Sequence, residues 1–185
     1  MDNQLIRHTL SRLVTTGALS LALANVCFGA SSMPSDDEDD FQVKQWEEGA
    51  VAFPSYPKPE SLQAIYVSAS TDNQFLVDMD SVTVAKEGVV RYTLVVLTAG
   101  GARNVTYEGM RCDTRERRLY ASGRADGTWS KARNSQWQRI QEAVTNRQYA
   151  ALFTEYFCPG GVIVFDAAEA KDALRRGGHP SVMRR

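Results

Sequence analysis

The stretch VVRYTLVVL at residues 89–97 decides the fold class predicted for this chain of 185 residues. Its alternation places Tyr92 and Leu94 on one face of an extended strand and Arg91 and Thr93 on the other. A strand with one apolar and one partly polar face is typical of a sheet that helices cover on a single side. We therefore expect an α+β domain.

Further strands are expected on both sides of this stretch, because segments rich in valine, tyrosine and threonine alternate with turn residues. These segments are residues 62–68, 75–78, 82–85, 103–112 and 117–122. Asp78-Met79-Asp80-Ser81 is interpreted as a turn between two of them. The connections are too short for parallel crossovers, so neighbouring strands are predicted to run antiparallel in a meander.

Gly109 marks a change of phase within the strand predicted over 103–112. The apolar positions shift there from Val105 and Tyr107 to Met110 and Cys112. A glycine at such a shift is typical of a β-bulge. We therefore predict a bulge at Gly109 that turns Cys112 inward.

Two helices are predicted after the strands. Residues 146–157 carry aromatic and aliphatic side chains at helical spacing, and the proline and glycines that follow Cys158 end this helix. A second helix begins at Asp166, which forms a capping-box-like pair with Glu169, and ends before Gly177. The predicted fold is thus an antiparallel, meander-like β-sheet covered on one face by two C-terminal helices.

Composition divides the chain into four parts. Residues 1–30 are interpreted as an export signal, because a weakly basic start precedes an apolar stretch too short and polar for a membrane span. Adjacent acidic residues make residues 31–45 a disordered leader. Residues 46–178 form a single globular domain, which opens with an extended proline-aromatic segment at 53–59. A flexible tail over 179–185 completes the chain.

Cysteine usage agrees with export to the periplasm. Cys112 and Cys158 are the thiols that remain in the domain, and an exported chain with two such cysteines favours one disulfide. Cys27 opens an alternative, since a cysteine at the end of an export signal is the lipid-modified first residue of lipoproteins. Val26 disfavours that processing, which requires a small residue before the cysteine. Periplasmic location is therefore predicted, with a lipid anchor through Cys27 as the alternative.

Catalytic chemistry has few candidate residues. The two histidines are His8 in the signal and His179 in the tail, so neither a histidine base nor a histidine-rich metal site is predicted. Paired cysteines exclude a thiolate nucleophile. Asp78 and Asp80 fit a turn better than an acid–base pair. We predict a protein without enzymatic activity, cofactor or metal.

Basic and aromatic residues gather between residues 111 and 137. Guanidinium groups beside aromatic rings hold phosphates and other anions, so a positive sheet face would attract anionic polymers or lipid headgroups. This candidate anionic-ligand face comprises Arg111, Arg115, Arg117, Arg118, Arg124, Tyr120 and Trp129, with Lys131, Arg133 and Trp137 beside them. The alternative is a hairpin of solvated arginines, neutralised by the nearby Glu108, Asp113, Glu116 and Asp126.

Five short motifs together resemble the cryptic neisserial protein 1-like family. They are YVSASTDNQF (66–75), GVVRYTL (88–94), YEGMRC (107–112), GTW (127–129) and YFCP (156–159). The resemblance implies a periplasmic or lipid-anchored protein of Gram-negative bacteria with no established activity, and the family's two cysteines would correspond to Cys112 and Cys158. No catalytic residue carries over.

Two function classes follow from these observations. The favoured one is a non-enzymatic module that binds an envelope protein or an anionic polymer through the arginine and aromatic face. The order strand, Asp78, strand, then a cysteine followed by arginines more faintly resembles surface-adhesin E type lipoproteins, and this resemblance also implies binding. The alternative is a carboxylate-dependent hydrolase of envelope polymers, which would require two acidic side chains in a deep cleft. The sequence predicts no specific nucleic-acid partner and no transmembrane helix in the mature protein, and it assigns no oligomeric state.

Overall fold

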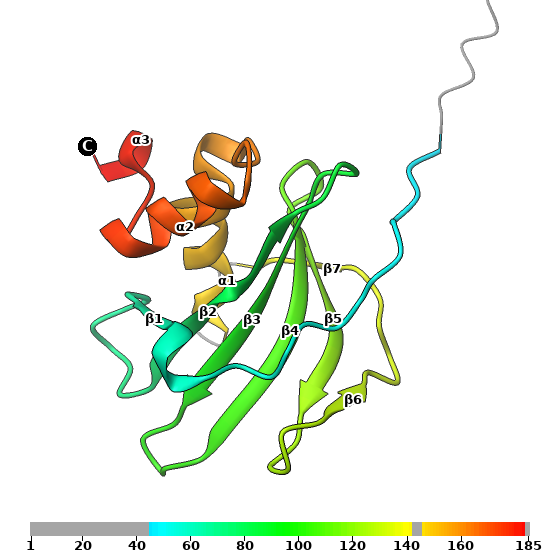
Figure 1. Cartoon of the computed structure of the whole chain (residues 1–185). Helices are drawn as coiled ribbons and strands as arrows, with labels where there is room; N and C mark the ends of the chain where they lie inside the picture. Colours follow the sequence, from blue (N-terminus) through cyan, green and yellow to red (C-terminus); the bar gives the residue numbers. More distant parts are fainter. Residues whose placement is uncertain (1–44, 142–145, 184–185) are drawn as a thin grey trace, which may run out of the picture. The chain divides into compact units, whose positions relative to one another are not determined.

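A computed structural model describes residues 45–141 and 146–183 of the chain, and within them an open antiparallel sheet is followed by helices (Figure 1). The strands are β1 (Leu62–Ile65), β2 (Gln74–Val84), β3 (Val89–Leu97), β4 (Arg103–Arg111), β5 (Glu116–Gly123), β6 (Trp129–Lys131) and β7 (Gln138–Arg139). They lie in the order β1-β2-β3-β4-β5-β6, and β7 also pairs with β5. The predicted α+β meander is confirmed.

The sheet differs from the prediction in three places. β2 runs through Asp78-Met79-Asp80-Ser81 as one strand whose register with β3 shifts between Asp78 and Thr83, so the turn interpretation is wrong. β1 ends at Ile65, short of the predicted residue 68. β6 and β7 are short strands that the pattern of apolar residues did not indicate.

The predicted bulge at Gly109 is also wrong. Gly109 pairs regularly with Arg91 of β3 and Arg118 of β5, and the irregularity between β4 and β5 lies at Tyr120 instead. A Cβ atom at Gly109 would collide with the Tyr120 side chain. The close approach of the tyrosine ring therefore explains the glycine at residue 109. The apolar residues of β4 change phase because both faces of the sheet are buried.

Helices cover one of these faces. They are α1 (Arg147–Ala151), which continues as the π-helical η2 (Leu152–Phe157), and α2 (Ala167–Arg176), with the 3-10 turn η3 (Pro159–Gly161) between them. Tyr92 of β3 packs on Phe157, with ring centroids 5.1 Å apart, and both side chains are buried. Leu152, Met110 and Leu174 belong to the same core. The predicted helical cover of the sheet thus forms through these large apolar side chains.

The predicted disulfide joins β4 to the end of η2. Cys112 and Cys158 are bonded, with Cα atoms 5.5 Å apart. The Cys158 backbone N–H donates to the Phe153 carbonyl, five residues earlier, which is the wide turn of a π-helix. The sequence prediction of a cross-link between a central strand and the covering helix is confirmed.

The second face of the sheet is covered by residues 46–58, which we call the strap. Figure 1 shows this segment, in cyan, crossing the strands opposite the helices. The Trp129 indole N–H donates to the Pro54 carbonyl at 2.8 Å, and the Trp46 indole donates to the Glu87 carbonyl at 2.8 Å. The strap leads into the 3-10 turn η1 (Pro59–Ser61) and β1. The face that we expected to be partly exposed to solvent is therefore covered.

The C-terminal segment is packed as far as the structure describes it. Asp166 caps α2 by accepting from the Glu169 backbone N–H at 2.8 Å, as predicted. Beyond α2, the His179 backbone N–H donates to the Glu155 carbonyl at 2.6 Å, and its ring lies 3.0 Å from Glu169. Helix α3 (Pro180–Met183) follows where the sequence predicts a flexible tail.

Three predictions for the N-terminal part of the chain concern residues that the structure does not describe. The export signal, Cys27 and the acidic leader up to residue 44 lie outside the described residues. No helix in the described part has the length and apolar composition needed to cross a membrane.

Candidate functional site

The predicted arginine and aromatic residues divide between the two faces of the sheet. Arg118 and Tyr120 lie under the strap, where both donate to the carboxylate of Glu48. Arg91 reaches the same carboxylate at 3.4 Å and Glu87 at 2.6 Å. The Glu48 side chain is only 10% exposed. Two of the predicted ligand residues thus form part of a buried ion cluster.

Two more predicted residues hold the strap in place. The Arg111 guanidinium lies 3.7 Å from the centroid of the Trp46 ring and pairs with Asp113 at 2.8 Å. Trp129 makes its hydrogen bond to the strap and packs against Tyr56, with ring centroids 5.6 Å apart. The side chains of Arg111 and Trp129 therefore take part in internal packing.

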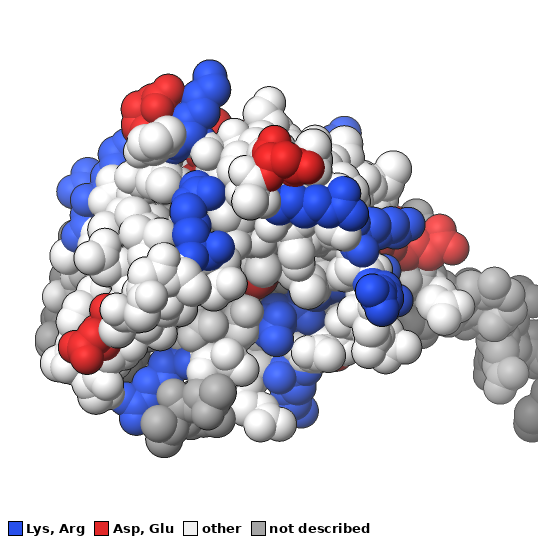
Figure 2. Space-filling model, turned by 90° about the horizontal axis from the view of Figure 1, so that it is seen from below, with Lys and Arg blue, Asp and Glu red and all other residues white. Residues whose placement is uncertain are grey.

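The last three arginines are placed apart from one another. Arg115 lies over the Phe153 ring, and Arg117 lies over the Tyr149 ring on the helix-covered side of the sheet. Arg124 is exposed and donates to Ser130 at 3.2 Å. Figure 2 shows the lysine and arginine side chains of one face in separate groups among uncharged ones. The predicted residues do not assemble into one continuous anionic-ligand face.

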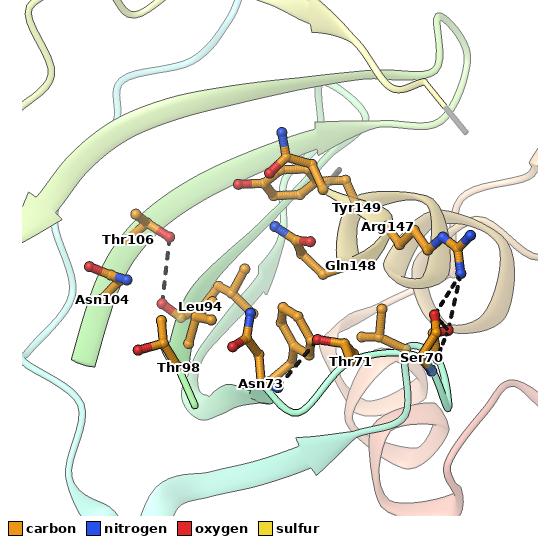
Figure 3. A pocket seen from close by; sticks show the side chains of 15 residues that line it. Ser70, Thr71, Asn73, Leu94, Thr98, Asn104, Thr106, Arg147, Gln148 and Tyr149 are labelled. Carbon is orange, nitrogen blue, oxygen red and sulfur yellow. Dashed lines mark hydrogen bonds between the residues drawn. The ribbon is translucent and has the colours of Figure 1, made fainter. Parts of the chain in front are cut away.

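A pocket of about 490 Å³ lies on the helix-covered side of the sheet, between the strands and the start of α1. Its polar wall comprises Ser68, Ser70, Thr71, Asn73, Thr98, Asn104, Thr106, Asn146, Arg147, Gln148 and Tyr149. Its apolar wall comprises Val67, Phe75, Leu94 and Val96. Figure 3 shows Gln148 and Tyr149 pointing from α1 toward the strands that carry Leu94 and Thr106. We call this hollow the amide pocket, because four carboxamides border it.

Hydrogen bonds fix several walls of the amide pocket. Arg147 donates to the hydroxyls of Ser68 and Ser70, at 3.1 Å each, which ties α1 to the loop after β1. The Asn73 Oδ1 atom accepts from the Ala99 backbone at 3.1 Å. These bonds join the loops at both ends of the pocket and restrain its walls.

A buried carboxyl lies beneath the pocket. Glu108 is fully buried and accepts hydrogen bonds from Thr106 at 2.8 Å and from Tyr92 and Tyr149 at 3.2 Å each. Burial raises the pKa of Glu108, and the hydroxyl donors and the charge of Arg117 only partly oppose that rise. Since Thr106 and Tyr149 line the amide pocket, Glu108 holds two of its walls in place.

This raised pKa predicts an unusual pH dependence of stability. The folded protein holds the Glu108 proton more tightly than the unfolded chain, so this group contributes most stability below the ordinary glutamate pKa of 4.5. That contribution is lost as the pH rises through the folded-state pKa. We expect urea unfolding between about pH 4 and pH 8 to show this loss in the wild type, with a slope of at most about 1.4 kcal/mol per pH unit.

The matched variants for that measurement are Glu108→Gln and Glu60→Gln. Glu60 is an exposed glutamate of η1, so its replacement is expected to preserve the wild-type pH profile. Glu108→Gln is expected to remove the loss of stability with rising pH. A wild-type protein that gains stability relative to Glu108→Gln as the pH rises would contradict this prediction.

Asp78 and Asp80, the carboxylates considered for hydrolysis, border a different hollow. It has a volume of about 310 Å³ and lies beside the strap, where Lys58 also borders it. Asp78 is almost fully buried and accepts from the Asp80 backbone N–H at 3.3 Å. This local hydrogen bond stabilises the register shift in β2. Within the described residues, no group of three or more histidine, cysteine or acidic side chains is placed to hold a metal ion.

Comparison with known proteins places the chain in a family. The model of the CNP1-like family matches residues 41–175. The chain belongs to the CNP1-like family. The match covers the strap, the sheet and nearly all of α2, so the amide pocket and the disulfide lie within the family's domain. No curated protein and no solved structure matches the chain.

The amide pocket was not predicted from the sequence. Its residues come from the loop after β1, three strands and the start of α1, and none of them belongs to a recognisable ligand motif. One signal was present in the polar run Ser68-Ala69-Ser70-Thr71-Asp72-Asn73, which is longer than a turn between strands requires. Within this run, Thr71-Asp72-Asn73 is interpreted only as a turn between strands.

Proposed function

We propose that this member of the CNP1-like family is an exported, non-enzymatic binding protein of the cell envelope, and that the amide pocket is its ligand site. The observation that carries the proposal is the composition of the pocket: hydroxyls, carboxamides and one arginine stand over an apolar floor. The signal-like N-terminus and the disulfide support export.

The chemistry of the walls favours a ligand rich in hydroxyl and amide groups. A carboxamide both donates and accepts hydrogen bonds, which suits sugar hydroxyls and acetamido groups. Asn73 accepts from the Ala99 backbone through its oxygen, so its NH2 end is the one offered to a ligand. Phe75, Leu94 and Val96 supply an apolar surface for the C–H face of a sugar ring. The ligand class is therefore an oligosaccharide.

Binding is favoured over hydrolysis by the same residues. The described lining of the amide pocket contains no carboxylate, histidine or cysteine, which are the usual acids, bases and nucleophiles of hydrolases. Glu108 lies below the lining with its carboxyl bonded to three hydroxyls. The carboxylate-dependent hydrolase is retained as the alternative, with Asp78 and Asp80 as its candidate residues.

A titration with a defined sugar tests this proposal. The probe is N,N'-diacetylchitobiose, an uncharged disaccharide, and binding is measured by titration calorimetry. The double variant Asn104→Ala/Gln148→Ala is expected to weaken binding about 5- to 150-fold, because each of the two lost hydrogen bonds contributes about 0.5–1.5 kcal/mol. The matched control is Asn134→Ala/Gln136→Ala, which removes exposed amides away from the pocket. Equal affinity of the two double variants would overturn the proposed site.

A further inference from the structure

A second hollow adjoins the amide pocket. It has a volume of about 450 Å³ and is bordered by Arg117, Gln138, Gln141, Asn146 and Tyr149, among others. Asn146 and Tyr149 also border the amide pocket. The two hollows are therefore adjacent, with Asn146 and Tyr149 as their common border, and a ligand longer than one sugar ring can contact both.

Arg117 gives the second hollow a positive charge. Its guanidinium carbon lies 3.9 Å from the centroid of the Tyr149 ring, and its NH2 group donates to Gln138 at 3.4 Å. Within residues 45–141 and 146–183, the ion pairs of the structure do not include Arg117. Arg139 also borders the hollow, and its backbone pairs in register with Glu116 of β5.

The stacked position of Arg117 suits a planar anion. A guanidinium that lies flat on an aromatic ring keeps its N–H edge available for a bidentate contact with a carboxylate. Tyr149 is itself held by its hydrogen bond to the buried Glu108, at 3.2 Å. The ring therefore provides a fixed base for the guanidinium, and little side-chain freedom is lost when an anion binds.

We infer that the second hollow binds a carboxylate of the same ligand, so that the ligand of the two adjacent hollows is an acidic oligosaccharide rather than a neutral one. This inference rests on the proposed function, because it places the acidic group of the ligand in the second hollow while the neutral part of the same ligand occupies the amide pocket. Arg117 is the residue that selects the charge.

A pair of disaccharides that differ in one acidic group tests the inference. N,N'-diacetylchitobiose is neutral, whereas N-acetylglucosaminyl-N-acetylmuramic acid has the same two rings with a lactyl carboxylate. In calorimetry at low ionic strength we expect the acidic disaccharide to bind about ten-fold more tightly, which is the effect of one charge-assisted contact. Added salt is expected to reduce this preference.

Matched arginine variants complete the experiment. Arg117→Gln is expected to remove the preference for the acidic disaccharide, while Arg175→Gln, an exposed arginine of α2, keeps it. Thermal unfolding of each variant shows that it is folded. Equal affinity of the wild type for the two disaccharides would overturn the inference and leave the proposed function standing. Absence of binding by both disaccharides would overturn the two together.

Discussion

Replacing both cysteines of the disulfide by alanine is expected to lower the free energy of unfolding by about 4 kcal/mol. The bond between Cys112 and Cys158 closes a loop with a sequence separation of 46 residues. In the chain-entropy model, opening a loop of this length raises the conformational entropy of the unfolded state, and this stabilises the unfolded state by about 4 kcal/mol. Both cysteines are buried in the core between the sheet and the helices, so loss of the bond also removes packing there.

Urea unfolding of the purified protein measures this effect. The wild type is compared with Cys112→Ala/Cys158→Ala, each with and without a reducing agent. The reductant is expected to destabilise the wild type to a similar degree and to leave the double variant unchanged. A double variant that loses less than about 1 kcal/mol would show that the bond contributes little to the stability of this domain.

The second large effect is expected at Glu48. Glu48→Gln removes the carboxylate shared by Arg91, Arg118 and Tyr120 beneath the strap. Breaking a buried ion pair costs about 3–5 kcal/mol, because the remaining charge is left without a partner. Arg91 keeps its contact with Glu87 and Arg118 is 30% exposed, so we expect a loss near the lower end of that range.

The neighbouring glutamate provides the control for this variant. Glu47 is exposed, and Glu47→Gln is expected to change the free energy of unfolding by no more than about 0.5 kcal/mol. Chemical denaturation compares the two variants. Tryptophan fluorescence reports whether the strap stays on the sheet, because Trp46 lies in the strap and Trp129 and Trp137 contact it. If the two substitutions had equal effects, Glu48 would not be what holds the strap.

Local patterns were sufficient for much of the fold. The strand over residues 89–97 has the predicted bounds, because its alternating side chains and the glycines and turn residues around it depend on near neighbours only. The cap of α2 by Asp166 is likewise a contact between residues three positions apart. The turn predicted at Asp78 was wrong because continued pairing with β3 favours an irregular strand over a turn.

The sequence by itself determined the antiparallel order of the strands, the helices that follow them and the pairing of Cys112 with Cys158. These features depend on periodicity, on short connections and on the small number of cysteines, all of which are visible along the chain. The tertiary structure decided which arginines form internal ion pairs, which pack on aromatic rings and which are exposed. Glu48 and Arg118 are 70 positions apart, and only folding brings the strap over that arginine. The amide pocket and Arg117 likewise come together only where loops, strands and α1 meet, since long-range packing determines which polar side chains remain available to a ligand.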